Sequence, residues 1–255
     1  MTYIDFHAHL DFDRFNKDRK EIVTEIKDKN IIVFTNTLNP KNYFETKEMF
    51  KLDNHIKVCP GLYPQDAEEI SDDDFNNYLI KLENMSDDFE VIGEVGLDKY
   101  HTKDNVKFEI QKNRFFKIIE FAHKLNKPLC IHTRNAEEEV LEILSGYIKK
   151  TGFNKFNLHC FMGKKKLIAK IKELGISCSI PLTILNTQSF QILVKELPIS
   201  QLLVETDSPF LNPDKSRNTP LNVPIIYNKI AEIKGLDKKE IEYIIYRNFQ
   251  KLVYL

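Results

Sequence analysis

Short apolar runs alternate with amphipathic helical stretches along the whole chain. Eight short runs of β-branched or other apolar residues are typical of buried strands: Tyr3–His7, Ile31–Asn36, Ile56–Gly61, Val91–Val95, Pro128–His132, Lys155–Cys160, Ile176–Ile180 and Leu202–Thr206. Between them, helical periodicity is found over Asp18–Lys29, Asp72–Met85, Asn105–Leu125, Ala136–Lys149, Lys165–Leu174 and Ser189–Leu197. A final pair of helical stretches, Val223–Lys234 and Lys238–Leu252, closes the chain.

Eight strand-then-helix repeats without a linker or low-complexity segment predict an α/β fold, a single (β/α)8 TIM barrel spanning residues 1–255. The length agrees, since barrels of this kind often use about 200–250 residues for one domain. A doubly wound open sheet has the same alternation of strands and helices. Periodicity by itself leaves that alternative open.

Composition and charge narrow the class of protein. Hydrophobic residues make up 42% of the chain, which provides a sizeable core and excludes a disordered protein. Thirty-seven basic and 38 acidic residues give a net charge of -1, so a site for a polyanion must be a local patch. No apolar run approaches the roughly 18 residues of a membrane span, and the first residues lack the basic region of a secretory signal.

The four cysteines indicate a reducing cellular compartment. None of them forms a C-x-x-C pair, and each lies in an apolar, strand-like run: Cys59, Cys130, Cys160 and Cys178. Buried, reduced thiols are typical of a cytoplasmic protein. No exposed apolar heptad indicates an obligate protein partner, so a monomer is expected.

Six polar residues stand at or just after the carboxyl ends of predicted strands: His7, His9, Glu94, His132, His159 and Asp207. In a barrel, all eight carboxyl ends open on one face, so these side chains are expected to converge there. Because side chains alternate along a strand, His7 and His9 point the same way, as two ligands of one ion require.

Four imidazoles and two carboxylates, with no cysteine, suit divalent ions such as magnesium, manganese or zinc. Six ligands exceed what one catalytic ion with an open position needs, so they predict two ions sharing a bridging hydroxide. Glu94 is the candidate bridging ligand, and Asp207 is the candidate acceptor of the proton from the attacking water. A single histidine of this kind is more often a core residue, and only the coincidence of all six carries the prediction.

Six sequence blocks resemble the signature blocks of the TatD family of metal-dependent deoxyribonucleases. They read HAHLD from His7, GEVGLD from Gly93, IHTR from Ile131, HCFMG from His159, ETDSP from Glu205 and RNTP from Arg217. The resemblance runs in order from residue 4 to about residue 250. It implies an amidohydrolase-like barrel, two divalent ions and hydrolysis of phosphodiester bonds in DNA, commonly by an exonuclease. It also implies that the six residues named above are the metal ligands.

One block departs from the family pattern. Many members carry G-x-H-P-H after the third strand, with histidines thought to face the substrate phosphate, whereas this chain has Tyr63 and Gln65 at those histidine positions. A hydroxyl and an amide can hydrogen-bond a phosphate but supply no positive charge. Lys99 is a further cation on the expected active face, and the predicted substrate contacts are Tyr63, His101, Arg134, Lys164 and Arg217.

Arg134 is the foremost of these contacts, because a guanidinium can hold a phosphate through two parallel hydrogen bonds. A salt bridge between Arg134 and Glu138, one helical turn away, is the competing interpretation. Lys164 opens a run of three lysines at the start of a helix, where positive charge is unfavourable. That run is either a solvated charge cluster or a phosphate contact.

Two other functions remain open. The same centre can hydrolyse an ester or amide bond, as in removing an amino acid from tRNA, although such barrels often hold a modified lysine where this chain has Glu94. The second is a nucleic-acid-binding subunit without catalysis, which the complete ligand set argues against. Tryptophan is absent and most of the 18 phenylalanines are spaced as core residues, so base stacking has no support from the sequence.

Overall fold

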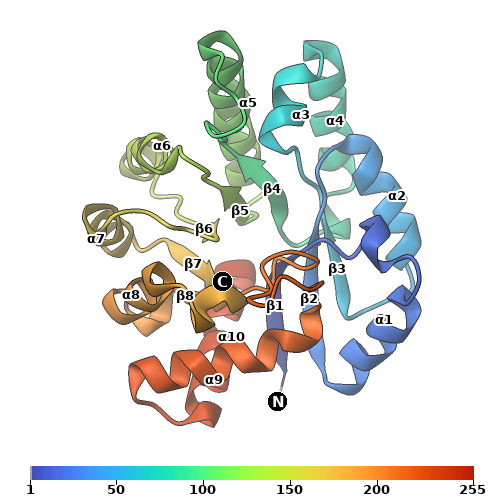
Figure 1. Ribbon diagram of the computed structural model, residues 1–255. Helices are drawn as coiled ribbons and strands as arrows, with labels where there is room; N and C mark the ends of the chain where they lie inside the picture. Colours follow the sequence, from blue (N-terminus) through green and yellow to red (C-terminus); the bar gives the residue numbers. More distant parts are fainter. Residues whose placement is uncertain (1) are drawn as a thin grey trace.

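The computed structural model describes residues 2–255 and arranges eight parallel strands as a ring enclosed by helices (Figure 1). The strands are β1 (Tyr3–Ala8), β2 (Ile31–Asn36), β3 (Ile56–Cys59), β4 (Ile92–Gly96), β5 (Leu129–His132), β6 (Phe156–His159), β7 (Ser177–Ile180) and β8 (Leu202–Val204). All eight coincide with the predicted runs to within two residues at each end. The predicted (β/α)8 barrel is therefore confirmed, and the open-sheet alternative is wrong.

The ring consists of two hydrogen-bonded ladders, β1-β2-β3 and β4-β5-β6-β7-β8, which meet at two seams. At the first seam, the Leu62 amide donates to the Glu94 carbonyl at 3.0 Å. At the second, the Asp207 amide donates to the His7 carbonyl at 2.9 Å, and the His9 amide donates to the Ser208 carbonyl at 2.7 Å. The chain leaves regular ladder geometry at these seams, which is why β3 and β8 end two residues before their predicted ends.

A glycine makes the first seam possible. A Cβ atom at Gly61 would lie 1.7 Å from the Thr37 carbonyl oxygen and 2.6 Å from the Glu94 amide nitrogen. No side chain fits at such distances, so only glycine allows the segment after β3 to approach β4. The position of Glu94 thus depends on a residue more than thirty positions away in the sequence.

In the described part of the chain, ten α-helices surround the strands (Figure 1). They are α1 (Arg19–Asp28), α2 (Pro40–Phe50), α3 (Pro64–Glu69), α4 (Asp72–Asn84), α5 (Asn105–Lys124), α6 (Glu137–Thr151), α7 (Lys165–Leu174), α8 (Gln188–Glu196), α9 (Val223–Lys234) and α10 (Lys238–Tyr254). Neither α2 nor α3 is among the helices predicted from the sequence. Both begin with a proline in the first turn, and the Asn39 side chain caps α2 by accepting from the Asn42 amide at 3.0 Å.

The two faces of each strand have different surroundings. Apolar side chains such as Phe34 pack outward on the helices, and the Phe34 and Phe249 rings lie 5.5 Å apart, joining β2 to α10. A buried polar network lies beneath the strand ends, where the Asn157 amide donates to the Ser179 hydroxyl at 2.8 Å and that hydroxyl donates to Glu205. Within residues 2–255, no helix has the length and apolar character of a membrane span.

Candidate metal centre

The six predicted ligands lie together at the carboxyl ends of the strands. β1 supplies His7 and places His9 just beyond its end, β4 supplies Glu94, and β5 and β6 end at the two remaining histidines. Asp207 follows β8 across the second seam. Five of the six residues are buried and Asp207 is half-buried, so the cluster is sheltered but reachable from the barrel mouth.

One oxygen of Glu94 faces a first group of ligands. The Nε2 atoms of His7 and His9 lie 3.2 Å apart, and the Asp207 Oδ1 atom lies 3.4 Å and 3.5 Å from them. Glu94 Oε2 lies 3.7 Å from His7 Nε2 and 3.6 Å from His9 Nε2. Four donor atoms from three elements thus surround one small volume.

The other oxygen of Glu94 faces a second group. Glu94 Oε1 lies 2.7 Å from His132 Nδ1 and 3.1 Å from His159 Nε2, and these two nitrogens are 3.3 Å apart. The second group has three protein donor atoms. Glu94 therefore stands between the groups with one oxygen toward each.

These distances fit divalent ions. Ligand atoms bound tetrahedrally at 2.0–2.1 Å are about 3.4 Å apart, and octahedral ones about 3.0 Å. The separations in the first group are 3.2–3.7 Å, and those in the second are 2.7–3.3 Å. The distances between donor atoms in both groups are thus compatible with those around a divalent ion. Nitrogen and carboxylate donors without thiolate suit zinc, manganese or magnesium.

The charges of the cluster are strongly coupled. Burial opposes ionisation of Glu94, but the imidazoles of His159 and His132 outweigh it and hold the pKa of Glu94 well below its usual range. Burial likewise opposes the charge on His9, but Asp207 and Glu94 raise the pKa of His9 to about 9. The two carboxylates thus attract positive charge to this site. Divalent ions can supply that charge in place of the imidazolium protons.

Oxygen atoms of three groups lie behind the imidazoles of His9, His132 and His159. The Asn36 carbonyl lies 2.8 Å from His9 Nδ1. Asp98 Oδ2 lies 3.2 Å from His132 Nε2, and Glu205 Oε1 lies 3.6 Å from His159 Nδ1. A partner of this kind fixes the ring orientation of a metal-binding histidine.

These supporting roles are not predicted from the sequence. Asp98 and Glu205 do lie inside the blocks GEVGLD and ETDSP, close to the ligands Glu94 and Asp207. That proximity in sequence is the signal that could have indicated their supporting roles. Their partners, however, are histidines on other strands, which only the closed ring brings near.

Asp98→Asn is expected to weaken the affinity of the second group for its ion by about 10–100-fold. The carboxylate of Asp98 accepts from His132, and an amide can place a donor there instead. Isothermal titration with manganese measures the change. Asp66→Asn, a half-buried carboxylate in α3 bonded to Asn39, is the matched control. An unchanged affinity in Asp98→Asn would remove Asp98 from this role.

Two predicted substrate contacts converge on Asp98. The Tyr63 hydroxyl donates to Asp98 Oδ2 at 3.3 Å, and His101 Nδ1 lies 2.7 Å from the same oxygen. The ring of Tyr63 lies edge-on to His132, with centroids 5.0 Å apart. Both residues therefore lie beside the second group. Gln65 follows in α3, and both polar atoms of its amide are buried without a hydrogen-bond partner among the described residues.

Arg134 does not form the competing salt bridge. Glu138 pairs instead with Lys166 at 2.7 Å. The Arg134 guanidinium is exposed and lies over the ring of Tyr100, with its Cζ atom 4.1 Å from the centroid. It follows β5 directly after His132, so it borders the mouth of the barrel.

Lys164 and Arg217 have different surroundings. Lys164 is exposed at the N-terminus of α7. Arg217 binds both carboxylate oxygens of Asp18 and donates to the Arg14 carbonyl at 2.7 Å. It thereby ties the long segment after β8 to the segment before α1. A phosphate contact by Arg217 would compete with this ion pair, so its tethering role is the one that the geometry favours.

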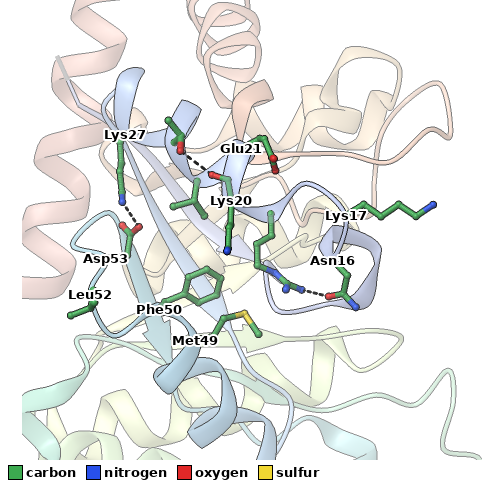
Figure 2. A pocket seen from close by; sticks show the side chains of 12 residues that line it. Asn16, Lys17, Lys20, Glu21, Lys27, Met49, Phe50, Leu52 and Asp53 are labelled. Atoms are coloured by element: carbon green, nitrogen blue, oxygen red, sulfur yellow. Dashed lines mark hydrogen bonds and ion pairs between the residues drawn. The ribbon is translucent and has the colours of Figure 1, made fainter.

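A cavity of about 610 Å³ lies elsewhere, between α1 and the end of α2 (Figure 2). Its lining includes Lys20, Met49 and Phe50, and Lys27 pairs with Asp53 across it at 2.7 Å. The lining contains no histidine or cysteine and none of the six ligands. This cavity is therefore separate from the cluster of six predicted ligands at the strand ends.

Comparison with known proteins agrees with this geometry. The chain is 32% identical over 257 residues to the metal-dependent hydrolase YabD of Bacillus subtilis, with 97% of each chain covered. It is 29% identical to the human deoxyribonuclease TATDN3, covering 98% of this chain and 93% of that one. The crystal structure of the TatD homolog YjjV of Escherichia coli superposes with a TM-score of 0.87 at 21% identity, covering 99% of this chain and 98% of that one, which shows the shared fold.

A family model assigns the same relationship to nearly the whole chain. The model described as TatD related DNase matches residues 4–254. The predicted resemblance is therefore confirmed, and with it a metal-dependent hydrolase acting on ester bonds. The chain belongs to the TatD-related DNase family of metal-dependent hydrolases.

Proposed function

We propose that this protein hydrolyses phosphodiester bonds of DNA as an exonuclease, with two divalent ions held by the six ligands. The observation that carries the proposal is the position of Glu94, whose two oxygens face two adjoining donor groups. The names of the family model and of the human relative support DNA as the substrate. When bound, such a pair of ions lowers the pKa of a water molecule and neutralises charge on a phosphoryl group.

Asp207 is the proposed general base. Its side chain is 13% exposed, more than that of any other ligand, and its Oδ1 atom faces His7 and His9. Although burial opposes its ionisation, these two histidines hold the pKa of Asp207 well below its usual range. The carboxylate is thus ionised and positioned at the mouth, where it can accept the proton of an attacking water.

Arg134 is proposed to hold the non-bridging oxygens of the substrate phosphate. Its guanidinium is free of carboxylate partners among the described residues and lies beside the second donor group. Lys164 and His101 border the same mouth, and Tyr63 can donate a hydroxyl hydrogen bond there. The net charge of -1 gives the protein no overall attraction for DNA, so local positive charge at the rim would supply it.

A nuclease assay on metal-stripped protein tests this proposal. The substrate is single-stranded DNA labelled at either end, and magnesium, manganese or zinc is added back. We expect no cleavage without ions and a ladder of products with at least one of them. The end from which the ladder grows reports the polarity of digestion.

The outcomes separate the proposed reaction from its alternatives. Folded protein that binds two ions but cleaves no DNA would overturn the proposal and favour hydrolysis of an ester or amide, with aminoacylated tRNA as the next substrate. Folded protein that neither binds ions nor cleaves would favour a binding subunit.

A further inference from the structure

Two exposed aromatic platforms border the metal centre. Phe12 follows β1 and Phe210 follows β8, with their rings 5.7 Å apart and edge-on. Phe12 also stacks on His9, with centroids 4.9 Å apart and rings inclined by 29°. Tyr100 follows β4 and lies edge-on to His101, with centroids 4.9 Å apart. Phe210 is 37% exposed and Tyr100 is 48% exposed.

The order of the strands places these platforms on opposite sides of the mouth. In a ring of eight strands taken in sequence order, β8 and β1 lie across from β4 and β5 (Figure 1). The Phe12–Phe210 platform therefore lies beside the first donor group, through its contact with His9. The Tyr100 platform lies beside the second, through His101, Asp98 and His132. The two donor groups lie between the platforms.

Each platform carries an arginine. The Arg14 Cζ atom lies 5.1 Å from the centroid of Phe210, and the Arg134 Cζ atom lies 4.1 Å from that of Tyr100. An aromatic face with a nearby cation is how proteins bind single-stranded nucleic acid, because the ring stacks on a base and the cation contacts the backbone. The spacing of phenylalanines along the chain did not reveal this, since the rings come from loops of different repeats.

We propose that Phe210 and Tyr100 are substrate-binding residues that stack on the nucleobases on the two sides of the scissile phosphate, with Phe12 supporting Phe210. This inference rests on the proposed DNA hydrolysis and names how the substrate strand is held there. Every base has a π-face, so the platforms bind DNA of any sequence. They also require unpaired bases, because bases in a duplex are already stacked on their neighbours.

The test compares two oligonucleotides with the same number of phosphates. One is single-stranded oligothymidylate, and the other carries abasic tetrahydrofuran residues in place of the terminal nucleotides. Phe210→Ala and Tyr100→Ala are each expected to lower kcat/KM for the base-bearing strand by about 10-fold. The loss for the abasic strand is expected to be smaller with either variant, because that strand has no base to stack. Phe210→Ala should leave kcat/KM for the abasic strand unchanged, whereas Tyr100→Ala also removes the ring that the Arg134 guanidinium contacts.

Matched controls come from exposed rings on the outer helices. Phe116 in α5 is 38% exposed and Tyr243 in α10 is 60% exposed. Phe116→Ala and Tyr243→Ala should leave both substrates unaffected. A second readout is 2-aminopurine at the terminal nucleotide, whose fluorescence falls on stacking. That quenching should be present with the wild-type protein and with both controls, and reduced with Phe210→Ala and Tyr100→Ala.

Different results would contradict base stacking and DNA hydrolysis. Base stacking would be overturned if the wild-type protein cleaves DNA and Phe210→Ala and Tyr100→Ala lower kcat/KM equally for both strands, or lower it for neither. DNA hydrolysis would then still stand. A wild-type protein that cleaves neither strand with any ion would overturn DNA hydrolysis, and base stacking with it.

Discussion

Glu94→Gln is expected to reduce the number of tightly bound divalent ions from two to at most one and to abolish most turnover. Within residues 2–255, Glu94 is the one side chain with an oxygen facing each donor group, Oε1 at 2.7 Å from His132 and Oε2 at 3.6 Å from His9. An amide has the same shape but only one oxygen and no charge. Metal catalysis contributes several kcal/mol, so we expect kcat to fall by about 1,000-fold.

Elemental analysis after gel filtration measures the ions, and the end-labelled DNA assay measures the rate. Glu242→Gln is the matched control, because Glu242 is a buried carboxylate in α10 that accepts from the Tyr3 hydroxyl at 2.6 Å, far from the strand ends. It should retain both ions and full activity. Two tightly bound ions in folded Glu94→Gln protein would contradict the bridging role of Glu94.

Asp207→Asn is expected to lower kcat by about 100- to 10,000-fold while the protein, at saturating manganese, still binds two ions. Asparagine keeps an oxygen donor in the first group, next to His7 and His9, but it cannot accept a proton from water. The backbone at Asp207 has a φ of 52°, in the left-handed region. Asparagine tolerates that region as well as aspartate does, so the loop should not move.

The readout is kcat together with the ion content of the same sample. Asp214→Asn provides a control in the same segment after β8, since Asp214 is exposed and bonds only within its own loop, to Ser216. A near wild-type rate in Asp207→Asn would exclude Asp207 as the base. Loss of ions in parallel with the rate would instead make Asp207 a ligand without a role in proton transfer.

The sequence by itself determined the strands of the barrel and the composition of the site. The apolar pattern of a buried strand is contained in a few consecutive residues, so each of the eight runs can be recognised without reference to its neighbours. A polar residue that ends a buried strand, such as His132 or Glu94, is conspicuous for the same reason. Once the barrel was inferred, these ends had to share one face. The six ligands could therefore be named, although their role as ligands stays a prediction.

Two helices, α2 and α3, could not be predicted from the local sequence pattern. α2 begins at Pro40 after the capping residue Asn39, and α3 begins at Pro64. Both follow short strands, and α3 is only six residues long. The start signals were present, but the apolar periodicity is weak over so few turns. Packing against the barrel stabilises such helices, and that contribution is not local.

Only the tertiary structure decided how side chains pair across the ring. Arg217 was expected at the substrate and instead binds Asp18, whereas Arg134, free of Glu138, lies over Tyr100. The supporting carboxylate of Asp98 and the platform of Phe12 and Phe210 likewise depend on loops from different repeats. These pairings form when the ring closes at its two seams, which places residues distant in sequence within a few ångströms. Periodicity reports which face of an element is buried, but closure of the ring determines which atoms meet there.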